Sequence, residues 1–214
     1  SAALVERELR IAQGTVVGCN HALEHGIAYN IAGGTHHAFS DRGEAFCLLN
    51  DQAIAAQYLI NQKKCHKILI VDLDVHQGNG TAEIFQNNAD VITFSMHGQS
   101  NYPFRKETSD YDIALPDKTD DTTYLSILQE TLPELLNIHR PDFVFYLAGV
   151  DILGTDKLGK LGCTLEGCKT RDSYVLGLCK SLGIPVQVSM GGGYSPAIKT
   201  IIEAHANTYR VARA

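Results

Sequence analysis

The segment "ILIVDLDVHQGNG", residues 68–80, passes from an apolar run into a polar turn that contains two glycines. Its first four residues are large and aliphatic, which is typical of a buried strand. Alternate residues of a strand point to the same face, so Asp72, Asp74 and His76 are expected to project together where the strand ends. Gly78 and Gly80 then mark a turn. Two carboxylates and an imidazole in this position indicate a functional site.

Strand and helix patterns alternate in both directions from this segment. Strands are expected over residues 27–32, 67–73, 91–96, 142–148 and 184–190, with a short extended piece over 111–115. Helices are expected over residues 4–25, 47–62, 81–86, 121–139, 164–183 and 195–209. The predicted N-caps are Asp121, Thr164 and Ser195. This alternation is typical of a parallel sheet with helices on both faces, so the sequence predicts an α/β protein.

The composition excludes several classes of protein. The chain has 214 residues, of which 44% are hydrophobic, and this favours one domain over residues 1–214. A net charge of −6 argues against direct binding of nucleic acid, which usually requires a basic face. No apolar run could cross a bilayer, and the first residues lack the apolar core of a signal peptide. None of the six cysteines lies in a Cys-x-x-Cys pair, so we expect an intracellular, cytoplasmic protein with reduced thiols.

Unusual polar residues follow the predicted strands. Ligands of open parallel sheets bind beyond the carboxyl ends of the strands. Four predicted strands lead into such residues, namely His36 and His37, Asp74 and His76, Asp151, and the "GGGY" of residues 191–194. These side chains are therefore expected to gather at one edge of the sheet.

The carboxylates and histidines in this group suit a metal site. Asp74, His76 and Asp151 form a set of three ligands, which is the number that catalytic zinc keeps from the protein. Ferrous iron also suits these donors. His36 and His37 offer a general base for a metal-activated water. The alternatives are a solvated or helix-capping cluster without metal, and loop histidines with satisfied hydrogen bonds.

Tyr194 follows three glycines, which let the backbone turn tightly and approach a ligand. Its hydroxyl could donate a hydrogen bond to a developing oxyanion. The alternative is a glycine loop that cradles phosphate. That reading has weak support, because no lysine follows the glycines and the chain has no Gly-x-Gly-x-x-Gly motif.

Four segments, in this order and at these separations, resemble the zinc-dependent histone deacetylases: "GGTHHAFSDRGEAFCLLND", "DLDVHQGNGTA", "YLAGVDILGTDKLGKL" and "MGGGY". The "HQGNG" and "DRGEAFC" stretches are most similar to the class IV branch. The resemblance implies a single-domain α/β protein with the three-layer arginase/deacetylase fold. Members of that family usually have a further segment before the point where this chain begins, so the N-terminal part of the domain is expected to be missing.

The resemblance also implies roles for the residues at the strand ends. Asp74, His76 and Asp151 match the family's zinc ligands. His36 and His37 match its tandem histidines, of which the second is expected to act as general base and acid.

Further positions follow from the same resemblance. Tyr194 matches the tyrosine that polarises the acyl carbonyl. Asp72 matches the partner of the first tandem histidine and, with Ser95, is expected to lie at a structural K⁺ or Na⁺ site. Asn79 stands behind the second histidine, where class I enzymes carry an aspartate.

The substrate tunnel is also implied by the resemblance. Phe46 and Tyr102 match its aromatic walls, Leu158 is expected at its mouth, and Gly192 is expected to border it. Ala45 replaces a glycine of many members, so we expect a slightly narrower tunnel there.

These assignments imply a zinc-dependent deacylase that hydrolyses the amide of an acylated lysine in a protein or peptide. One alternative is an amidohydrolase of the same scaffold that acts on small acylated amines such as acylpolyamines, which needs acidic residues at the tunnel mouth. Another is a binuclear manganese hydrolase like arginase, which needs additional ligands. A third is a non-catalytic module that binds acyl-lysine, although binding alone would not require ligands, base and tyrosine together.

Overall fold

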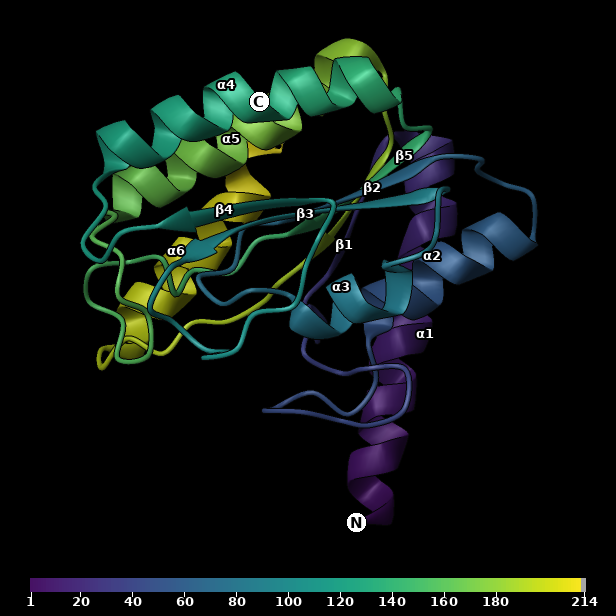
Figure 1. Ribbon diagram of the computed structural model, residues 1–214, viewed down its shortest axis with the longest axis horizontal. Coiled ribbons are helices and arrows are strands. Elements are labelled where there is room, and N and C mark those ends of the chain that lie inside the picture. The colour runs from purple at the N-terminus through teal and green to yellow at the C-terminus, as the bar shows by residue number, and fades with distance from the viewer. Residues whose placement is uncertain (213–214) are drawn as a thin grey trace.

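A single six-stranded sheet organises the chain, in a computed structural model that describes residues 1–212 (Figure 1). Every ladder in the sheet is parallel, and the strand order is β1-β6-β5-β2-β3-β4. The strands are β1 (Ile27–Asn30), β2 (Ile68–Asp72), β3 (Val91–Gly98), β4 (Tyr111–Leu115), β5 (Phe143–Leu147) and β6 (Val186–Ser189). The predicted parallel α/β sheet is confirmed.

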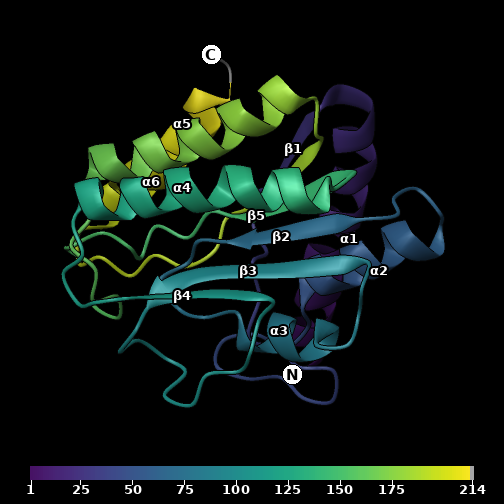
Figure 2. The same ribbon diagram turned by 45° about the horizontal axis from the view of Figure 1, so that its top comes forward.

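Helices cover both faces of this sheet. The helices are α1 (Ala2–His25), α2 (Asp51–Asn61), α3 (Asn79–Phe85), α4 (Asp121–His139), α5 (Leu165–Leu182) and α6 (Ile198–Val211). Figure 2 shows α1, α2 and α3 on one side of the sheet and α4, α5 and α6 on the other. None of these helices, over residues 1–212, combines the length and apolar character that a bilayer-spanning segment needs.

β5 is built of aromatic and aliphatic residues throughout, and β2 is apolar up to its last residue, Asp72, because both faces of these central strands are buried. Ile68 and Ile70 of β2 pack in a cluster with α1 and α2, whereas Leu69 and Val71 pack in the cluster that contains α4 and α5. Buried parallel strands are typically near-continuous in apolar residues for this reason. The apolar run therefore ends where β2 leaves the two helical layers, at the first polar residue of the site.

The second predicted helix begins later than expected, at Asp51 instead of residue 47. Asn50 is the N-cap, and its side chain accepts a hydrogen bond from the Ala53 amide at 3.0 Å. The residues before it cannot continue the helix, because Glu44 and Cys47 close a tight turn with two backbone hydrogen bonds of 2.9 Å. The cap at Asn50 and the turn before it therefore delay the start of the helix, although the apolar pattern of this segment predicts an earlier start.

Two predicted N-caps are wrong. Asp120, not Asp121, caps α4 by accepting from the Thr123 amide, whereas Asp121 accepts two hydrogen bonds from Thr164. The final helix begins at Ile198 instead of residue 195, because the Ser195 hydroxyl pairs with Thr155 at 2.8 Å and caps no helix. The predicted cap at Thr164 is confirmed. In both cases, the side chain that was expected to cap a helix instead forms a hydrogen bond with a residue distant in sequence.

The strand that was expected to align Asp72, Asp74 and His76 ends before it reaches Asp74. The strand alternation stops at Asp72, the last residue of β2, and the Asp72 carboxylate accepts from the Asp74 amide at 3.1 Å. The three side chains still lie close together, because Asp72 and Asp74 both face His36 and Asp74 lies 3.0 Å from His76. His76 also faces Asp151, beyond the end of β5.

Candidate active site

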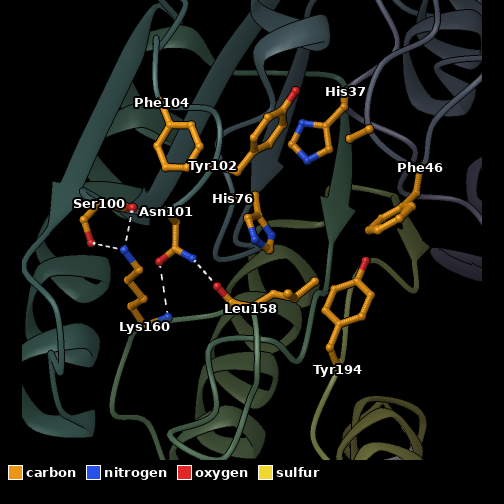
Figure 3. Close-up of a pocket in the computed structure, with 11 residues that line it drawn as sticks. His37, Phe46, His76, Ser100, Asn101, Tyr102, Phe104, Leu158, Lys160 and Tyr194 are labelled. Carbon is orange, nitrogen blue, oxygen red and sulfur yellow. Dashed lines mark hydrogen bonds between the residues drawn. The ribbon is translucent and has the colours of Figure 1, made fainter.

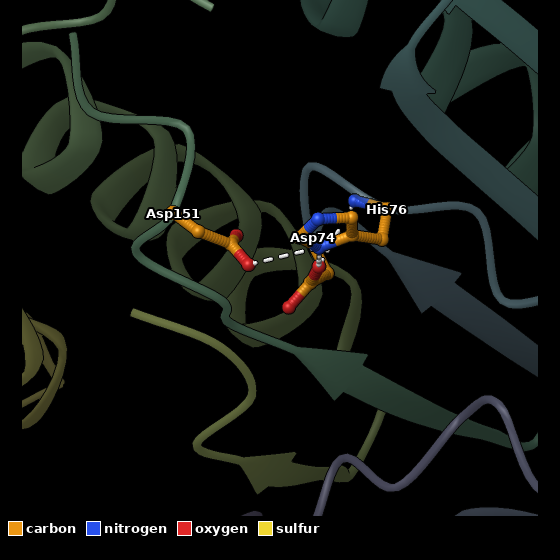
Figure 4. A group of neighbouring side chains, drawn as sticks. All are labelled: Asp74, His76 and Asp151. Carbon is orange, nitrogen blue, oxygen red and sulfur yellow. Dashed lines mark hydrogen bonds and ion pairs between the residues drawn. The ribbon is translucent and has the colours of Figure 1, made fainter. Parts of the chain in front are cut away.

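A carboxylate–histidine–carboxylate triad lies beyond the ends of β2 and β5 (Figure 4). Asp74, His76 and Asp151 are all buried, and one ligand atom of each lies within 4.8 Å of the other two. The Nδ1 atom of His76 is 3.0 Å from Asp74 Oδ1 and 3.2 Å from Asp151 Oδ2. Three atoms that could bind a metal therefore converge on one point.

The triad fits a small divalent cation. Tetrahedral ligands about 2.0 Å from a shared zinc lie about 3.3 Å from one another, close to the spacings found here. Asp151 Oδ2 is buried and accepts no hydrogen bond, so it is free to bind an ion. Burial lowers the pKa of His76, but the adjacent carboxylates of Asp151 and Asp74 outweigh burial and raise the pKa to about 10. Two buried carboxylates thus create a site that favours a positive charge.

Close backbone contacts fix the triad. The Gly192 amide donates to Asp74 Oδ2 at 2.8 Å, and the Val75 amide donates to Asp151 Oδ1 at 3.0 Å. A Cβ atom at Gly192 would lie 2.1 Å from Asp151 Oδ2, so no larger residue fits there. Gly192 therefore lies behind the metal-binding atoms and is not among the residues that line the cavity described below.

Arg171 holds the two ligand-bearing segments together and was not identified from the sequence. It is fully buried in α5, and its Nη1 atom donates to the carbonyls of Leu73 and Gly149, at 3.1 and 2.7 Å. Each carbonyl lies within two residues of a triad aspartate. The charge is balanced by Asp172, 2.8 Å away. A sequence signal exists, because both residues fall in the buried stripe of α5 among Cys168, Val175 and Cys179, where charge is unexpected.

The tandem histidines have different partners. His36 Nδ1 donates to Asp72 Oδ2 at 2.6 Å, and His37 Nδ1 pairs with Asn79 Oδ1 at 2.7 Å. Burial lowers the pKa of His36, but the Asp72 carboxylate outweighs burial and raises it to about 9. Burial and then the charge of His36, whose ring is 4.1 Å from that of His37, lower the pKa of His37 to about 3. His36 is thus cationic at neutral pH, and His37 is neutral.

Asp51 positions the loop that carries these histidines, and the sequence analysis also missed it. It is buried at the first position of α2, and its Oδ1 atom accepts from the amides of Gly34 and Thr35, each at 2.9 Å. Its Oδ2 atom accepts from the Thr15 hydroxyl of α1 at 2.7 Å. An acidic residue in the first turn of a helix is common, so nothing in the sequence marks this one.

A cavity of about 340 Å³ leads from the surface to these groups (Figure 3). Its lining includes the site residues His37, Phe46, His76, Tyr102, Leu158 and Tyr194. The rings of Phe46 and Tyr194 are 6.0 Å apart on one side, and the Tyr102 ring stands edge-on to His37, 5.1 Å away. Ala45 also lines the cavity, with a left-handed φ of 50° that a glycine would adopt without strain.

The side-chain oxygens expected at the monovalent-cation site, those of Ser95 and Asp72, already have hydrogen-bond partners in the protein. Ser95 lies opposite Asp72 in the ladder between β2 and β3. Its hydroxyl is 3.0 Å from His97 Nδ1, and both carboxylate oxygens of Asp72 have protein partners, at His36 and at the Asp74 amide. A cation there stays a prediction.

Comparison with known proteins identifies the family of this chain. Residues 1–209 match the histone deacetylase domain family. The chain is 48% identical to an uncharacterised protein of Picosynechococcus sp. over 213 residues, which are 100% of this chain and 71% of that protein. It is 31% identical to histone deacetylase 2 of Arabidopsis thaliana over 192 residues, which are 88% of this chain and 50% of that enzyme.

Two solved structures share the fold. The HD domain of HDA15 superposes with a TM-score of 0.80 at 26% identity, over 95% of this chain and 62% of that one. The acetylpolyamine aminohydrolase of Burkholderia pseudomallei superposes with a TM-score of 0.78 at 26% identity, over 95% of this chain and 61% of that one. The chain thus spans about half the length of the Arabidopsis relative and about three fifths of these structures.

Proposed function

The chain belongs to the histone deacetylase family, and from this we propose that it is one catalytic domain that hydrolyses the amide of an acylated lysine side chain in a protein or peptide. One observation carries the proposal. The same cavity is lined by the proposed base His37, the proposed metal ligand His76 and the proposed oxyanion donor Tyr194. A module that only binds acyl-lysine would not need all three.

We propose that the triad holds zinc. Asp74, His76 and Asp151 would balance the charge of a divalent ion with two carboxylates and a neutral imidazole, and three is the number of protein ligands in catalytic zinc sites. Such an ion supplies a Lewis acid for the amide carbonyl and lowers the pKa of a water bound to it. Ferrous iron suits the same donors, so metal analysis of the purified protein has to distinguish the two.

The proton transfers belong to His37. Its neutral ring can accept a proton from the attacking water at Nε2, since Nδ1 is engaged by Asn79. It can then deliver that proton to the departing lysine amine, which balances the hydrolysis. The cationic His36 beside it, held by Asp72, stabilises the negative charge that develops on the substrate.

Replacing Tyr194 with phenylalanine is expected to lower turnover by roughly 10²–10³-fold, the usual loss for one oxyanion donor. Burial and then the charges of Asp74 and Asp151 raise the pKa of Tyr194, so its hydroxyl stays protonated and can donate. The position of the backbone is unaffected, because it is held by a 2.6 Å hydrogen bond from the Tyr194 amide to Asp156.

The measurements for this variant are turnover, bound metal and affinity for an acyl-lysine peptide. Metal content and affinity should stay unchanged, because the hydrogen bond strengthens mainly in the transition state. A near-normal rate would mean that Tyr194 only packs against Phe46, and loss of metal would mean that the loop is structural.

The mouth of the cavity favours a peptide over a polyamine. Among its lining residues there is no carboxylate and one cation, Lys160, whose ammonium donates to the Ser100 carbonyl at 3.0 Å (Figure 3). A second amine of an acylpolyamine would meet this positive charge. The exposed rings of Phe46 and Phe104 offer apolar surface that suits a peptide chain.

The substrate class can be tested by comparing an acetyl-lysine peptide with an acetylated diamine. We expect a higher kcat/KM for the peptide, and we expect Lys160→Glu to shift the preference toward the diamine. Lys199→Glu is the matched control, since Lys199 is an exposed residue of α6 outside the cavity lining. Activity confined to the diamine in the unchanged protein would refute the peptide substrate, and inactivity on all acylated amines would refute the function.

The arginase-like alternative has less support. Over residues 1–212, Asp74, His76 and Asp151 form the one group of three or more side chains close enough to share a metal. A binuclear site needs a second set of ligands beside it.

A further inference from the structure

Glu44 occupies a fixed position beside Asn79, the hydrogen-bond partner of His37. Its amide and carbonyl both bond to Cys47 at 2.9 Å, which closes a four-residue turn with Phe46 near the tip. The Glu44 side chain points back from this turn to Asn79, the buried first residue of α3. The turn thus carries an apolar residue to the cavity mouth and a carboxylate to the base.

A chain of hydrogen bonds connects this carboxylate to His37. Glu44 Oε1 accepts from Asn79 Nδ2 at 2.9 Å, and Asn79 Oδ1 is 2.7 Å from His37 Nδ1. The Tyr102 hydroxyl donates to the same oxygen of Glu44. Tyr102 and His37 lie side by side in the cavity wall (Figure 3).

An ionised carboxylate can only accept hydrogen bonds, whereas an asparagine amide has one donating end and one accepting end. We propose that Glu44 is a positioning residue that orients the Asn79 amide and so places the proton of neutral His37 on Nδ1. The NH₂ end of Asn79 must face Glu44, which leaves the amide oxygen for His37. His37 then has to donate from Nδ1, and its Nε2 lone pair is free.

The reversed amide would disable the base. It would place two acceptor oxygens, Asn79 Oδ1 and Glu44 Oε1, in contact, and it would turn the NH₂ group toward His37 Nδ1. His37 would then accept at Nδ1 and carry its proton on Nε2. A neutral imidazole that carries its proton on Nε2 has no lone pair on that nitrogen. It therefore cannot accept a proton there from the attacking water. Leaving a buried amide without its hydrogen-bond partner is also unfavourable, so the carboxylate sets a clear preference.

Glu44 keeps its charge under ordinary conditions. The hydrogen bond from Tyr102 is the largest influence on this carboxyl and lowers its pKa, and the bond from Asn79 lowers it further. Arg42 adds a positive charge 3.5 Å from the other carboxylate oxygen. The acceptor-only form on which the amide orientation depends is therefore the form present near neutral pH.

The catalytic consequence rests on the proposed function, but the proton position does not. Glu44→Gln replaces the carboxylate with a group that can donate or accept, so both amide orientations become available. We expect kcat to fall about 10- to 100-fold, the loss that is typical when a partner orienting a metal-binding side chain is removed, with KM and metal content unchanged. Long-range ¹H–¹⁵N spectra, with His37 assigned from His37→Ala, should show the proton on Nδ1 in the unchanged protein and partly on Nε2 in the variant.

A double variant tests the direction of the hydrogen bonds. In Glu44→Gln with Asn79→Asp, the glutamine NH₂ can donate to the new aspartate, and the aspartate can accept from His37 Nδ1. This pair restores the acceptor beside His37, so we expect it to recover most of the activity that Glu44→Gln loses. Glu83→Gln is the matched control, because Glu83 bonds to Ser40 of the same loop at 2.9 and 3.1 Å.

Each outcome bears on the proposal. A proton on Nε2 of His37 in the unchanged protein overturns it, and so does Glu44→Gln with an unchanged proton position and rate. Equal loss in the single and double variants also overturns it. An inactive protein in which Glu44→Gln still moves the proton supports the role of Glu44 and refutes the deacylase function instead.

Discussion

Replacing Asp151 with asparagine is expected to abolish metal retention and turnover together. Asp151 Oδ2 faces His76 Nδ1 at 3.2 Å and accepts no hydrogen bond, so it is available to bind an ion. A neutral amide removes one of the two charges that make the site favour a cation. The loss of metal affinity and of turnover should exceed roughly 10- to 100-fold, which is the typical effect of mutating a residue that only hydrogen-bonds to a metal ligand. Elemental analysis and turnover on the same preparation measure both effects.

The same substitution should not weaken the metal-free fold. Burial and then the charge of Asp74 raise the pKa of Asp151 from its ordinary value of 3.8 to about 7. Folding therefore loses stability as the pH rises from about 4 to about 7, because the unfolded chain ionises this group first. Above pH 7 the full penalty is present in the metal-free protein. The variant lacks that group, so its metal-free melting temperature should be no lower than that of the unchanged protein.

Asp41→Asn provides the control, since Asp41 is an exposed residue whose side chain, within residues 1–212, bonds to neighbouring Arg42 alone. It should retain metal and activity. Full metal content in the Asp151 variant would contradict the three-ligand site. Two equivalents of manganese in the active, unchanged protein would contradict the single-ion site and favour the arginase-like reading.

The sheet could be predicted because its signals are strong and local. The run before Asp72 is apolar at every position, and a strand buried on both faces needs that pattern. The rule that ligands gather at the carboxyl ends of parallel strands then located Asp74, Asp151 and Tyr194 from residues far apart in sequence. Strand identity and strand direction were sufficient for this, and exact helix boundaries were not needed.

The helix caps and the supporting residues could not be predicted because they depend on partners distant in sequence. Ser195 has the residue type of an N-cap, yet Thr155 takes its hydroxyl. Asp51 holds the loop before His36, and Arg171 joins carbonyls from two strand ends. Neither role follows from local pattern, since each needs the folded positions of residues tens of places apart.

His37→Ala is expected to lower turnover by roughly 10²–10⁴-fold, the usual contribution of a general acid–base group. His37 is neutral because burial and the charge of His36 lower its pKa to about 3, and its ring lies in the cavity wall. Stability should change little, since the side chain has one hydrogen-bond partner, Asn79. Turnover per folded, metal-loaded molecule is the measurement, with melting temperature recorded alongside.

His36→Ala is expected to reduce stability more, and turnover less, than His37→Ala does. His36 and Asp72 form a buried pair at 2.6 Å, and removing one partner of such a pair typically costs about 3–5 kcal/mol. Its folded pKa is raised to about 9, so the stability that it contributes is present at neutral pH and is lost as the pH rises through 9. We therefore expect a lower melting temperature at pH 7 and a smaller loss of turnover per folded molecule than in His37→Ala.

Comparing the His36 and His37 variants distinguishes the histidine that transfers protons from the one that stabilises the site. Both histidines are buried, their rings are 4.1 Å apart, and each has one short hydrogen bond, so burial alone predicts similar effects for both. What distinguishes them is the partner, a carboxylate for His36 and an amide for His37. Equal losses of turnover would mean that the pair acts as one unit. A larger loss at His36 would assign the proton transfer to the histidine that Asp72 holds.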